Sequence, residues 1–258
     1  FLTDSHTHLD DHAFDEDREE VIRRARQDGV QRMITVGSLA GVQGAERSLA
    51  IARAHEGIWA TVAVHPHEAR LADRQTVERI EKLADDPLVV AIGETGLDYH
   101  YDHSPRAQQR QVFRRFIRMA IEKQKPLVIH TREAMEDTLR IMDEEDGWSA
   151  GGVFHCYSGG AEHAPTILDH GFHLSFAGVV TFKKATAVRD LVRTLPTDRV
   201  LVETDAPYLT PAPFRGKRNE PARVKLTAET VARLWDVSLD EAARITSDNA
   251  ARIFRLDG

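Results

Sequence analysis

The 258-residue chain is 41% hydrophobic and 29% charged, which is the balance of an ordinary globular protein and excludes a disordered one. It has no run of about 18 consecutive apolar residues, so a membrane-spanning helix is excluded. The net charge of −7 argues against a protein that wraps duplex nucleic acid, since such proteins are usually basic. Any role on nucleic acid must therefore depend on a local basic patch or on bound metal ions.

Cysteine usage and the chain start bear on the cellular compartment. The single cysteine, Cys156, excludes an internal disulfide and thiolate zinc clusters. Phe1–Asp4 lacks the charged and apolar regions of a signal peptide. These features predict a cytoplasmic protein. We further expect a monomer without an obligate protein partner, because no exposed apolar stripe stands out.

Short β-branched runs alternate with longer amphipathic segments along the chain. We expect strands at Leu2–His6, Arg32–Val36, Ile58–Val64, Val89–Gly93, Pro126–His130, Gly152–His155, His173–Phe176 and Val200–Glu203. Helices are expected at Asp17–Asp28, Val42–Ala54, Gln75–Ala84, Arg106–Lys123, Glu133–Glu145 and Ala185–Leu195. Eight strands that alternate with helices favour one (β/α)8 TIM-barrel domain over residues 1–258. An open doubly wound sheet would normally carry a glycine-rich nucleotide turn, which is missing here.

Two helix starts have recognisable capping signals. Ser104 precedes Pro105 and is expected to cap the helix that follows, with proline in the first turn. Ser238 and Glu241 form a capping-box pattern. This pattern predicts the start of the last helix.

Polar residues recur at the C-terminal ends of the expected strands. They are His6, His8, His65, Glu94, His130, His155 and Asp205. In a barrel these positions converge on one mouth, where barrel enzymes hold their active sites. Each residue alone has an ordinary interpretation, such as a surface histidine pair, a solvated loop acid or a buried core histidine. Their joint occurrence predicts a metal site.

The ligand types narrow the metal chemistry. Imidazole and carboxylate without thiolate suit Zn, Mn, Ni, Co or Fe, and also Mg where oxygen ligands dominate. Four histidines and two carboxylates exceed the three protein ligands of one catalytic zinc. We therefore expect two divalent metal ions per chain. Glu94 is the expected bridge between an ion on His6, His8 and Asp205 and an ion on His130 and His155.

Several motifs together resemble a known family, the TatD-type metal-dependent deoxyribonucleases of the amidohydrolase superfamily, in the branch that keeps both histidines of H-x-H. The motifs are DSHTHLD (4–10), VHPH (64–67), GETGLDY (93–99), PLVIHTR (126–132), FHCYSG (154–159), LVETDAPYL (201–209) and RNEP (218–221). The resemblance spans nearly the whole chain. It implies a barrel, a two-metal site on the residues above, and phosphodiester hydrolysis with DNA as the usual substrate. With the acidic net charge, it favours exonuclease action on single strands or damaged ends.

Such a two-metal site would activate a water for attack on the phosphate. Asp205 is the expected general base or proton shuttle. Glu203, two residues earlier, is expected to orient a ligand rather than to be one. His65 is expected to contact a phosphate oxygen or to hold a ligand in place.

Substrate binding has a weaker signal. Phe214–Asn219 forms a compact basic loop whose Arg215, Lys217 and Arg218 are expected to contact phosphates. Arg132 and Tyr99 could add charge and a stacking surface.

Two other functions compete with the nuclease. One is hydrolysis of a small cyclic amide, lactone or phosphoester on the same scaffold, since fold does not determine function. Many such enzymes bridge their metals with a carboxylated lysine, and no lysine ends the expected strand Val89–Gly93. That enzyme would have a closed apolar pocket. The other is a non-enzymatic metal-binding or scaffold role, which would require a saturated site without room for water.

Overall fold

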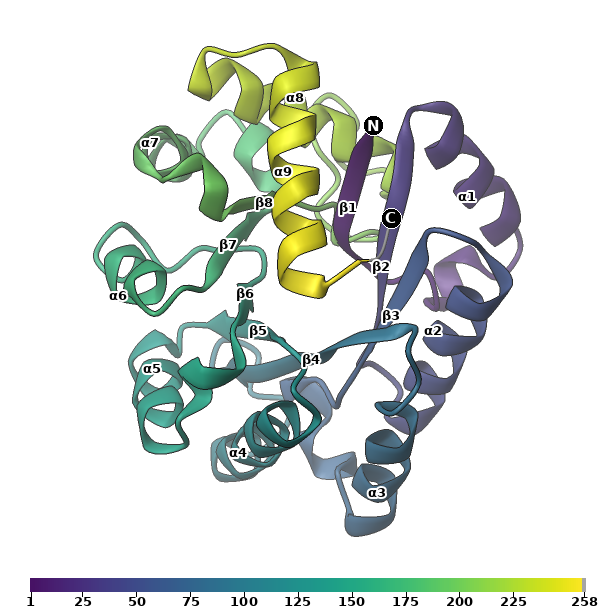
Figure 1. Cartoon of the computed structure of the whole chain (residues 1–258), viewed down its shortest axis with the longest axis vertical. Helices are drawn as coiled ribbons and strands as arrows, with labels where there is room; N and C mark the ends of the chain where they lie inside the picture. Colours follow the sequence, from purple (N-terminus) through teal and green to yellow (C-terminus); the bar gives the residue numbers. More distant parts are fainter. Residues whose placement is uncertain (257–258) are drawn as a thin grey trace.

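The computed structural model describes residues 1–256, and its eight strands form one parallel sheet in chain order (Figure 1). The strands are β1 (Leu2–Thr7), β2 (Val30–Gly37), β3 (Ile58–Val62), β4 (Val89–Asp98), β5 (Leu127–Arg132), β6 (Gly152–Phe154), β7 (His173–Phe176) and β8 (Val200–Val202). The expected (β/α)8 barrel is confirmed.

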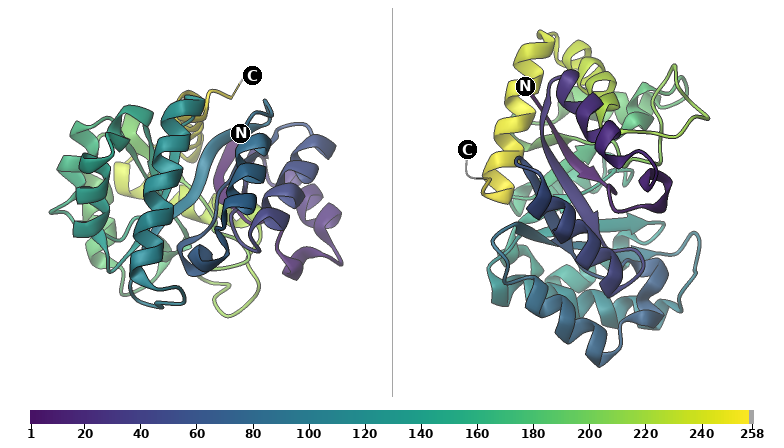
Figure 2. Two further views of the ribbon diagram at one scale, coloured as in Figure 1. Left: turned by 90° about the horizontal axis from the view of Figure 1, so that it is seen from below. Right: turned by 90° about the vertical axis from the view of Figure 1, so that its right-hand side faces the viewer.

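Helices surround the sheet on the outside (Figures 1 and 2). They are α1 (Arg18–Gln27), α2 (Val42–Ala54), α3 (Arg74–Leu83), α4 (Arg106–Lys123), α5 (Met135–Glu144), α6 (Ala164–Asp169), α7 (Thr186–Thr194), α8 (Val224–Trp235) and α9 (Leu239–Phe254). On α4 the apolar side chains, including Phe113, Phe116 and Ile117, are buried in the core that the helix shares with the sheet. None of the helices in residues 1–256 combines the length and apolar content needed to cross a bilayer.

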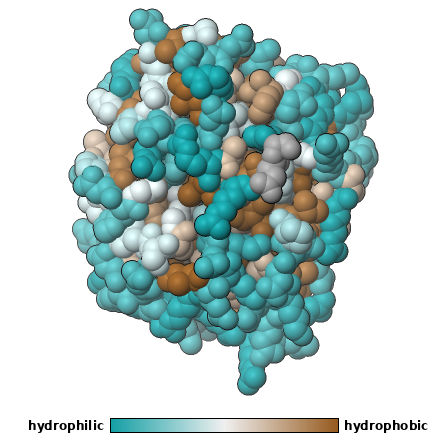
Figure 3. Space-filling model, in the orientation of Figure 1, coloured by the Kyte–Doolittle hydropathy of each residue, from teal (hydrophilic) through white to brown (hydrophobic). Residues whose placement is uncertain are grey.

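The N-terminal end of the barrel is covered by α9. The Asn249 side-chain amide donates hydrogen bonds to the carbonyl oxygens of Thr197 and Val200, at 2.8 and 2.9 Å, just where β8 begins. At the end of α9, Phe254 packs with apolar strand residues such as Val90 and Leu201. Figure 3 views this face and shows apolar surface gathered near its middle within a mostly hydrophilic rim. This end is a packed apolar layer, so an open site belongs at the opposite end.

The sheet is joined between its first and last strands by the segment that follows β8. Thr7 and Ala206 form a single parallel bridge. The backbone N–H of Asp205 donates to the His6 carbonyl at 2.9 Å, and that of His8 donates to the Ala206 carbonyl at 2.8 Å. This pairing brings Asp205 beside the two histidines of the H-x-H segment.

Several boundaries differ from expectation. β4 continues five residues past Gly93 to Asp98, because its far half pairs with β5 through Arg132. The expected Ser104 cap is wrong: α4 has Pro105 at its N-cap position without a side-chain cap. Ser104 Oγ instead donates to the His67 carbonyl at 2.7 Å. The Ser238 cap is confirmed, since its side chain accepts the Glu241 backbone N–H at 3.1 Å.

Candidate metal centre

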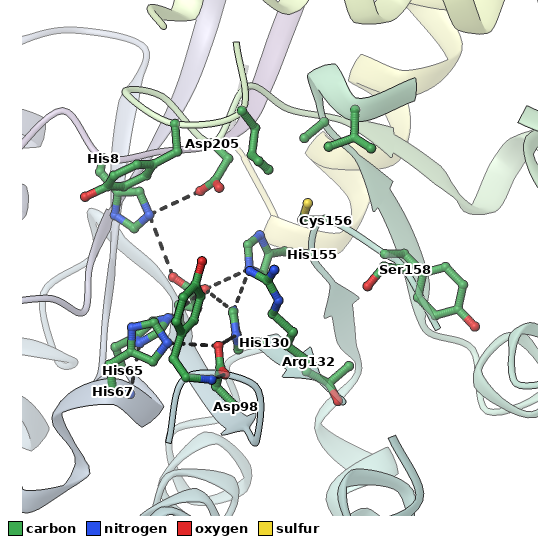
Figure 4. Close-up of a pocket in the computed structure, with 18 of the residues that line it drawn as sticks. His8, His65, His67, Asp98, His130, Arg132, His155, Cys156, Ser158 and Asp205 are labelled. Atoms are coloured by element: carbon green, nitrogen blue, oxygen red, sulfur yellow. Dashed lines mark hydrogen bonds and ion pairs between the residues drawn. The ribbon is translucent and has the colours of Figure 1, made fainter. Parts of the chain in front are cut away.

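The six residues expected to bind metal lie together at the C-terminal end of the barrel, and Figure 4 shows four of them, His8, His130, His155 and Asp205. They are His6 in β1, His8 just after it, Glu94 in β4, His130 in β5, His155 just after β6 and Asp205 in the segment after β8. A cavity of about 640 Å³ opens over them. They meet there because all eight strands run parallel, so residues at strand ends share one end of the barrel.

Glu94 lies at the middle of this cluster and presents its two oxygens to different histidines. Its Oε1 lies 2.9 Å from His130 Nδ1, 2.7 Å from His155 Nε2 and 3.3 Å from His65 Nε2. Its Oε2 lies 3.6 Å from His6 Nε2 and 3.8 Å from His8 Nε2. This is the position that a carboxylate between two ligand groups would take.

The second group is His6, His8 and Asp205. Asp205 Oδ1 lies 3.4 Å from His8 Nε2 and 3.6 Å from His6 Nε2. The side-chain ligand atoms of these three residues lie close enough to hold one cation, as do those of Glu94, His130 and His155. A third arrangement, His6 with His155 and Glu203, has similar spacing.

In three of the histidines, the ring nitrogen that points away from the cluster faces an oxygen atom. His8 Nδ1 faces the Val36 carbonyl at 3.0 Å, His155 Nδ1 faces Glu203 Oε1 at 3.2 Å, and His130 Nε2 faces Asp98 Oδ2 at 3.0 Å. In metal sites such outer contacts select the tautomer and aim the other ring nitrogen at the ion. The contact from Glu203 agrees with the orienting role expected for it.

Unpaired buried atoms test whether a cation fits here. Both ring nitrogens of His6 and Oε2 of Glu203 are buried without a hydrogen-bond partner in residues 1–256. Buried polar atoms are rarely left unpaired, because losing water without a replacement bond is costly. A divalent cation would supply the missing partner for His6, and the donor set of imidazoles and carboxylates suits such ions. The residues present therefore fit the metals that the sequence predicts.

The charge state of the centre favours a cation as well. Burial alone would raise the pKa of Glu94, but His155, His65 and His130 hold it well below the usual value. Burial lowers the pKa of His8, yet Asp205 and Glu94 outweigh burial and raise it to about 9. Glu94 is thus ionised at neutral pH, and so is Asp205, whose pKa His8 and His6 hold below the usual value against the effect of burial. A bound cation would replace the protons held by the histidines.

Two residues that the sequence reasoning did not single out, His67 and Asp98, complete the centre. Asp98 Oδ2 accepts hydrogen bonds from His67 Nε2 at 2.8 Å and His130 Nε2 at 3.0 Å. The signal was available in the sequence, because positions 94 and 98 lie on the same face of an extended strand. It was missed because the expected strand ended at Gly93.

Gly96 allows β4 to reach this far beside β5. It pairs with His130 in register, and its φ is +140°. A Cβ at this position would lie 2.0 Å from the His130 carbonyl oxygen. Only glycine therefore lets Glu94 and Asp98 lie on either side of His130.

The predicted substrate-binding residues divide into two groups. His65 and Arg132 line the cavity. Tyr99 is turned away, and its hydroxyl donates to Asp137 at 2.6 Å. The structure does not bring the basic loop to the cavity lining either: Arg218 pairs with Asp17 at 2.7 Å, while Arg215 lies over Phe182 and Lys217 over Phe214.

The remaining cavity wall has two kinds of surface. One side is apolar and consists of Leu39, Phe176, Val179, Val180, Val188 and Leu209. A neighbouring hollow of about 650 Å³ shares Thr131, Arg132 and Ser158 with the cavity. Its other lining residues include four carboxylates, Glu133, Glu136, Asp137 and Glu162.

Known proteins resemble this chain over its whole length. The family of TatD-related DNases matches residues 3–255. The metal-dependent hydrolase YabD of Bacillus subtilis is 43% identical, over 99% of this chain and 100% of its own. The 3′-5′ ssDNA/RNA exonuclease TatD of Cronobacter sakazakii is 36% identical, over 93% of each chain. The crystal structure of YjjV, a TatD homologue from Escherichia coli, superimposes with a TM-score of 0.93 at 26% identity, over 99% of this chain and 98% of YjjV.

Proposed function

Since the chain belongs to the TatD-related DNase family of metal-dependent hydrolases, we propose that it is a two-metal exonuclease that removes nucleotides from the 3′ end of single-stranded DNA. The observation that carries the proposal is Glu94, whose two oxygens face two groups of ligands under one open cavity. The 36% identical relative named as a 3′-5′ ssDNA/RNA exonuclease supports the substrate and the direction.

The charges around the cavity support attack at a strand end. A strand that continued through the neighbouring hollow would pass Glu133, Glu136, Asp137 and Glu162. Phosphates close to carboxylates repel each other, most strongly where water is scarce. Arg132 stands at the boundary between the two hollows. We infer that the chain end enters the cavity and stops at this boundary.

The side chains around the cluster would take separate roles in phosphodiester hydrolysis. Divalent ions bound at the cluster would lower the pKa of the attacking water and neutralise charge on the phosphate. Asp205 lines the cavity, and His8 and His6 outweigh burial to hold its pKa below the usual value, so its carboxylate is free to accept the proton. His65 Nδ1 accepts the His67 backbone N–H at 3.1 Å, which places the ring proton on Nε2, 3.3 Å from Glu94 Oε1. Ions bound at the cluster would take up this carboxylate oxygen, and the Nε2 proton could then be donated to a phosphate oxygen. Glu203 and Asp98 hold His155 and His130 in place.

The test uses metal-stripped protein and single-stranded oligonucleotides labelled at the 5′ or the 3′ end, with Mg²⁺, Mn²⁺ or Zn²⁺ added separately. We expect metal-dependent shortening from the 3′ end, two metals bound per chain, and loss of turnover in Glu94→Ala. Cleavage inside the strand would contradict the exonuclease. Retained activity in Glu94→Ala with metal still bound would remove the bridging role.

The apolar wall formed by residues such as Val179, Val180 and Leu209 favours a second candidate, hydrolysis of a small cyclic ester or amide. In that case the same protein would bind two metals but leave every oligonucleotide intact. A panel of lactones, cyclic amides and phosphoesters in the same buffers separates the two functions.

A further inference from the structure

The loop between β4 and α4 places an exposed aromatic ring at the cavity. Tyr101 is 49% exposed and lines the cavity wall. Its ring is nearly parallel to that of His103, at 11° and 5.5 Å between centroids. The Arg132 guanidinium lies over the Tyr101 ring, with Cζ 4.8 Å from the centroid. We call these three residues, His103, Tyr101 and Arg132, the Tyr101 platform.

One carboxylate connects this platform to the metal centre. Asp98 Oδ1 accepts the backbone N–H groups of Tyr101 and His100 at 2.9 and 3.1 Å. Its Oδ2 accepts from His130 and His67, and the His67 ring meets Tyr101 edge-on at 5.3 Å. The distance between the platform and the cluster is therefore set by hydrogen bonds to the buried Asp98 carboxylate.

Arg132 is the unusual member of the platform. Its guanidinium makes no ion pair and donates no hydrogen bond within residues 1–256, and no other arginine or lysine among them lines the cavity. In Figure 4 its side chain extends from β5 toward His155 and His130. A guanidinium layered on a tyrosine offers a flat, positively charged surface.

Flat surfaces of this kind bind nucleobases, because every base has a π face that stacks on aromatic rings and guanidinium groups. We propose that the Tyr101 platform is a stacking subsite for the base of the terminal nucleotide whose phosphate lies at the histidine–carboxylate cluster. This subsite rests on the proposed function for its substrate. It selects unpaired ends, because a base within a duplex has its faces covered by its neighbours.

Tyr99, two residues earlier, provides a matched control. An arginine also lies over its ring, with Arg106 Cζ 4.3 Å from the centroid. Tyr99 differs in that it lines the neighbouring hollow and its hydroxyl is hydrogen-bonded to Asp137. Replacing Tyr99 removes the same chemical group without touching the cavity over the metal centre.

The first experiment measures stacking without turnover. The probe is a short single-stranded phosphorothioate oligonucleotide with 2-aminopurine as its 3′-terminal base, whose fluorescence falls when the base stacks. We expect quenching by the wild type and by Tyr101→Phe and Tyr99→Leu. In Tyr101→Leu we expect the quench to disappear and the Kd to rise about tenfold. Equal quenching by Tyr101→Leu, or none by the wild type, would overturn the subsite.

The second experiment compares hydrolysis of two oligonucleotides, one ending in a normal nucleotide and one in an abasic nucleotide. Tyr101→Leu is expected to lose about tenfold in kcat/KM on the first and to match the wild type on the second. A loss of the same size on both substrates would contradict base stacking. The two proposals fail separately: quenching without hydrolysis under any ion would end the exonuclease, and hydrolysis unchanged in Tyr101→Leu would end the subsite.

Discussion

The two ends of the barrel are built from the same strands but bury opposite kinds of side chain. At the C-terminal end Glu94, His130 and His155 are in mutual contact beneath an open cavity. At the N-terminal end α9 covers an apolar layer that contains Phe254. The parallel sheet separates the two tasks: one end is packed for stability, which lets the other hold polar groups that would not be buried for stability alone.

Buried histidines at the two ends show how much their neighbours matter. His173 begins β7 at the closed end, and both of its ring nitrogens lack hydrogen-bond partners within residues 1–256. Burial lowers its pKa to about 4, and Arg199 and Arg252 add to the effect. His8 is as deeply buried, but Asp205 and Glu94 outweigh burial and raise its pKa to about 9. Between these two histidines, the carboxylates beside His8 and the arginines beside His173 account for the difference in charge.

The largest expected effect tests the open end. Glu94→Gln keeps the size of the side chain but removes the charge that faces both ligand groups. We expect kcat to fall by at least about a thousandfold, as for loss of a central electrostatic group. Thermal unfolding should change by only a few degrees, because the packed end is untouched. Oligonucleotide turnover measures kcat, thermal unfolding measures stability, and calorimetric titration counts the metal ions bound. Two ions bound with normal turnover would contradict the role assigned to Glu94.

The matching change at the closed end is Phe254→Ala. Removing this buried ring should lower the free energy of unfolding by about 3–5 kcal/mol. Turnover per folded molecule should be unchanged, since the ring lies at the other end of the barrel. Urea unfolding and active-site titration check this. A large drop in kcat of the folded fraction would show that the two ends are coupled.

A third prediction concerns pH. Because the pKa of folded His173 is about 4 and its ordinary value is 6.5, unfolding takes up a proton between these values, so stability is lost as the pH falls through that window. The full loss is about 3 kcal/mol. His173→Leu should remove this contribution of His173 to the loss of stability in acid. Urea unfolding at pH 7 and pH 4.5 gives the fall in the free energy of unfolding for the wild type and for His173→Leu. His6 and His65 titrate in both proteins, so their contributions cancel when the two falls are compared. Equal acid sensitivity in the two proteins would contradict the pKa.

The smallest effects compare the arginine of the cavity wall with an arginine of the basic loop. Arg132→Ala should raise KM about ten- to a hundredfold, since it removes the guanidinium layer of the Tyr101 platform on which a base would stack. Arg218→Ala should leave KM within about threefold and cost at most about 1 kcal/mol of stability, because its partner is the partly exposed Asp17. Steady-state kinetics on one oligonucleotide at fixed salt compares them. The reverse order would mean that the basic loop moves onto the substrate.

Much of the fold and the cluster could be predicted because the signals are local. The 42–54 and 106–123 helices have the expected bounds, and the strand-end positions of Glu94, His130 and Asp205 indicated one shared centre. The differences between expectation and structure have a common cause: contacts with residues distant in sequence. Ser104 caps nothing because a distant carbonyl, that of His67, takes its hydroxyl. Tyr99 and Arg218 are held by Asp137 and Asp17, and no pattern around them records those partners.

The sequence by itself determined the alternation of strands and helices and the chemical types at the strand ends, since apolar periodicity and residue identity are properties of the chain. Only the tertiary structure decided which oxygen of Glu94 faces which histidine, that Asp98 joins His130 to the loop of Tyr101, and that Tyr101 rather than Tyr99 lines the cavity. Such choices depend on contacts between residues distant in sequence, and they form only when the sheet curves into a barrel.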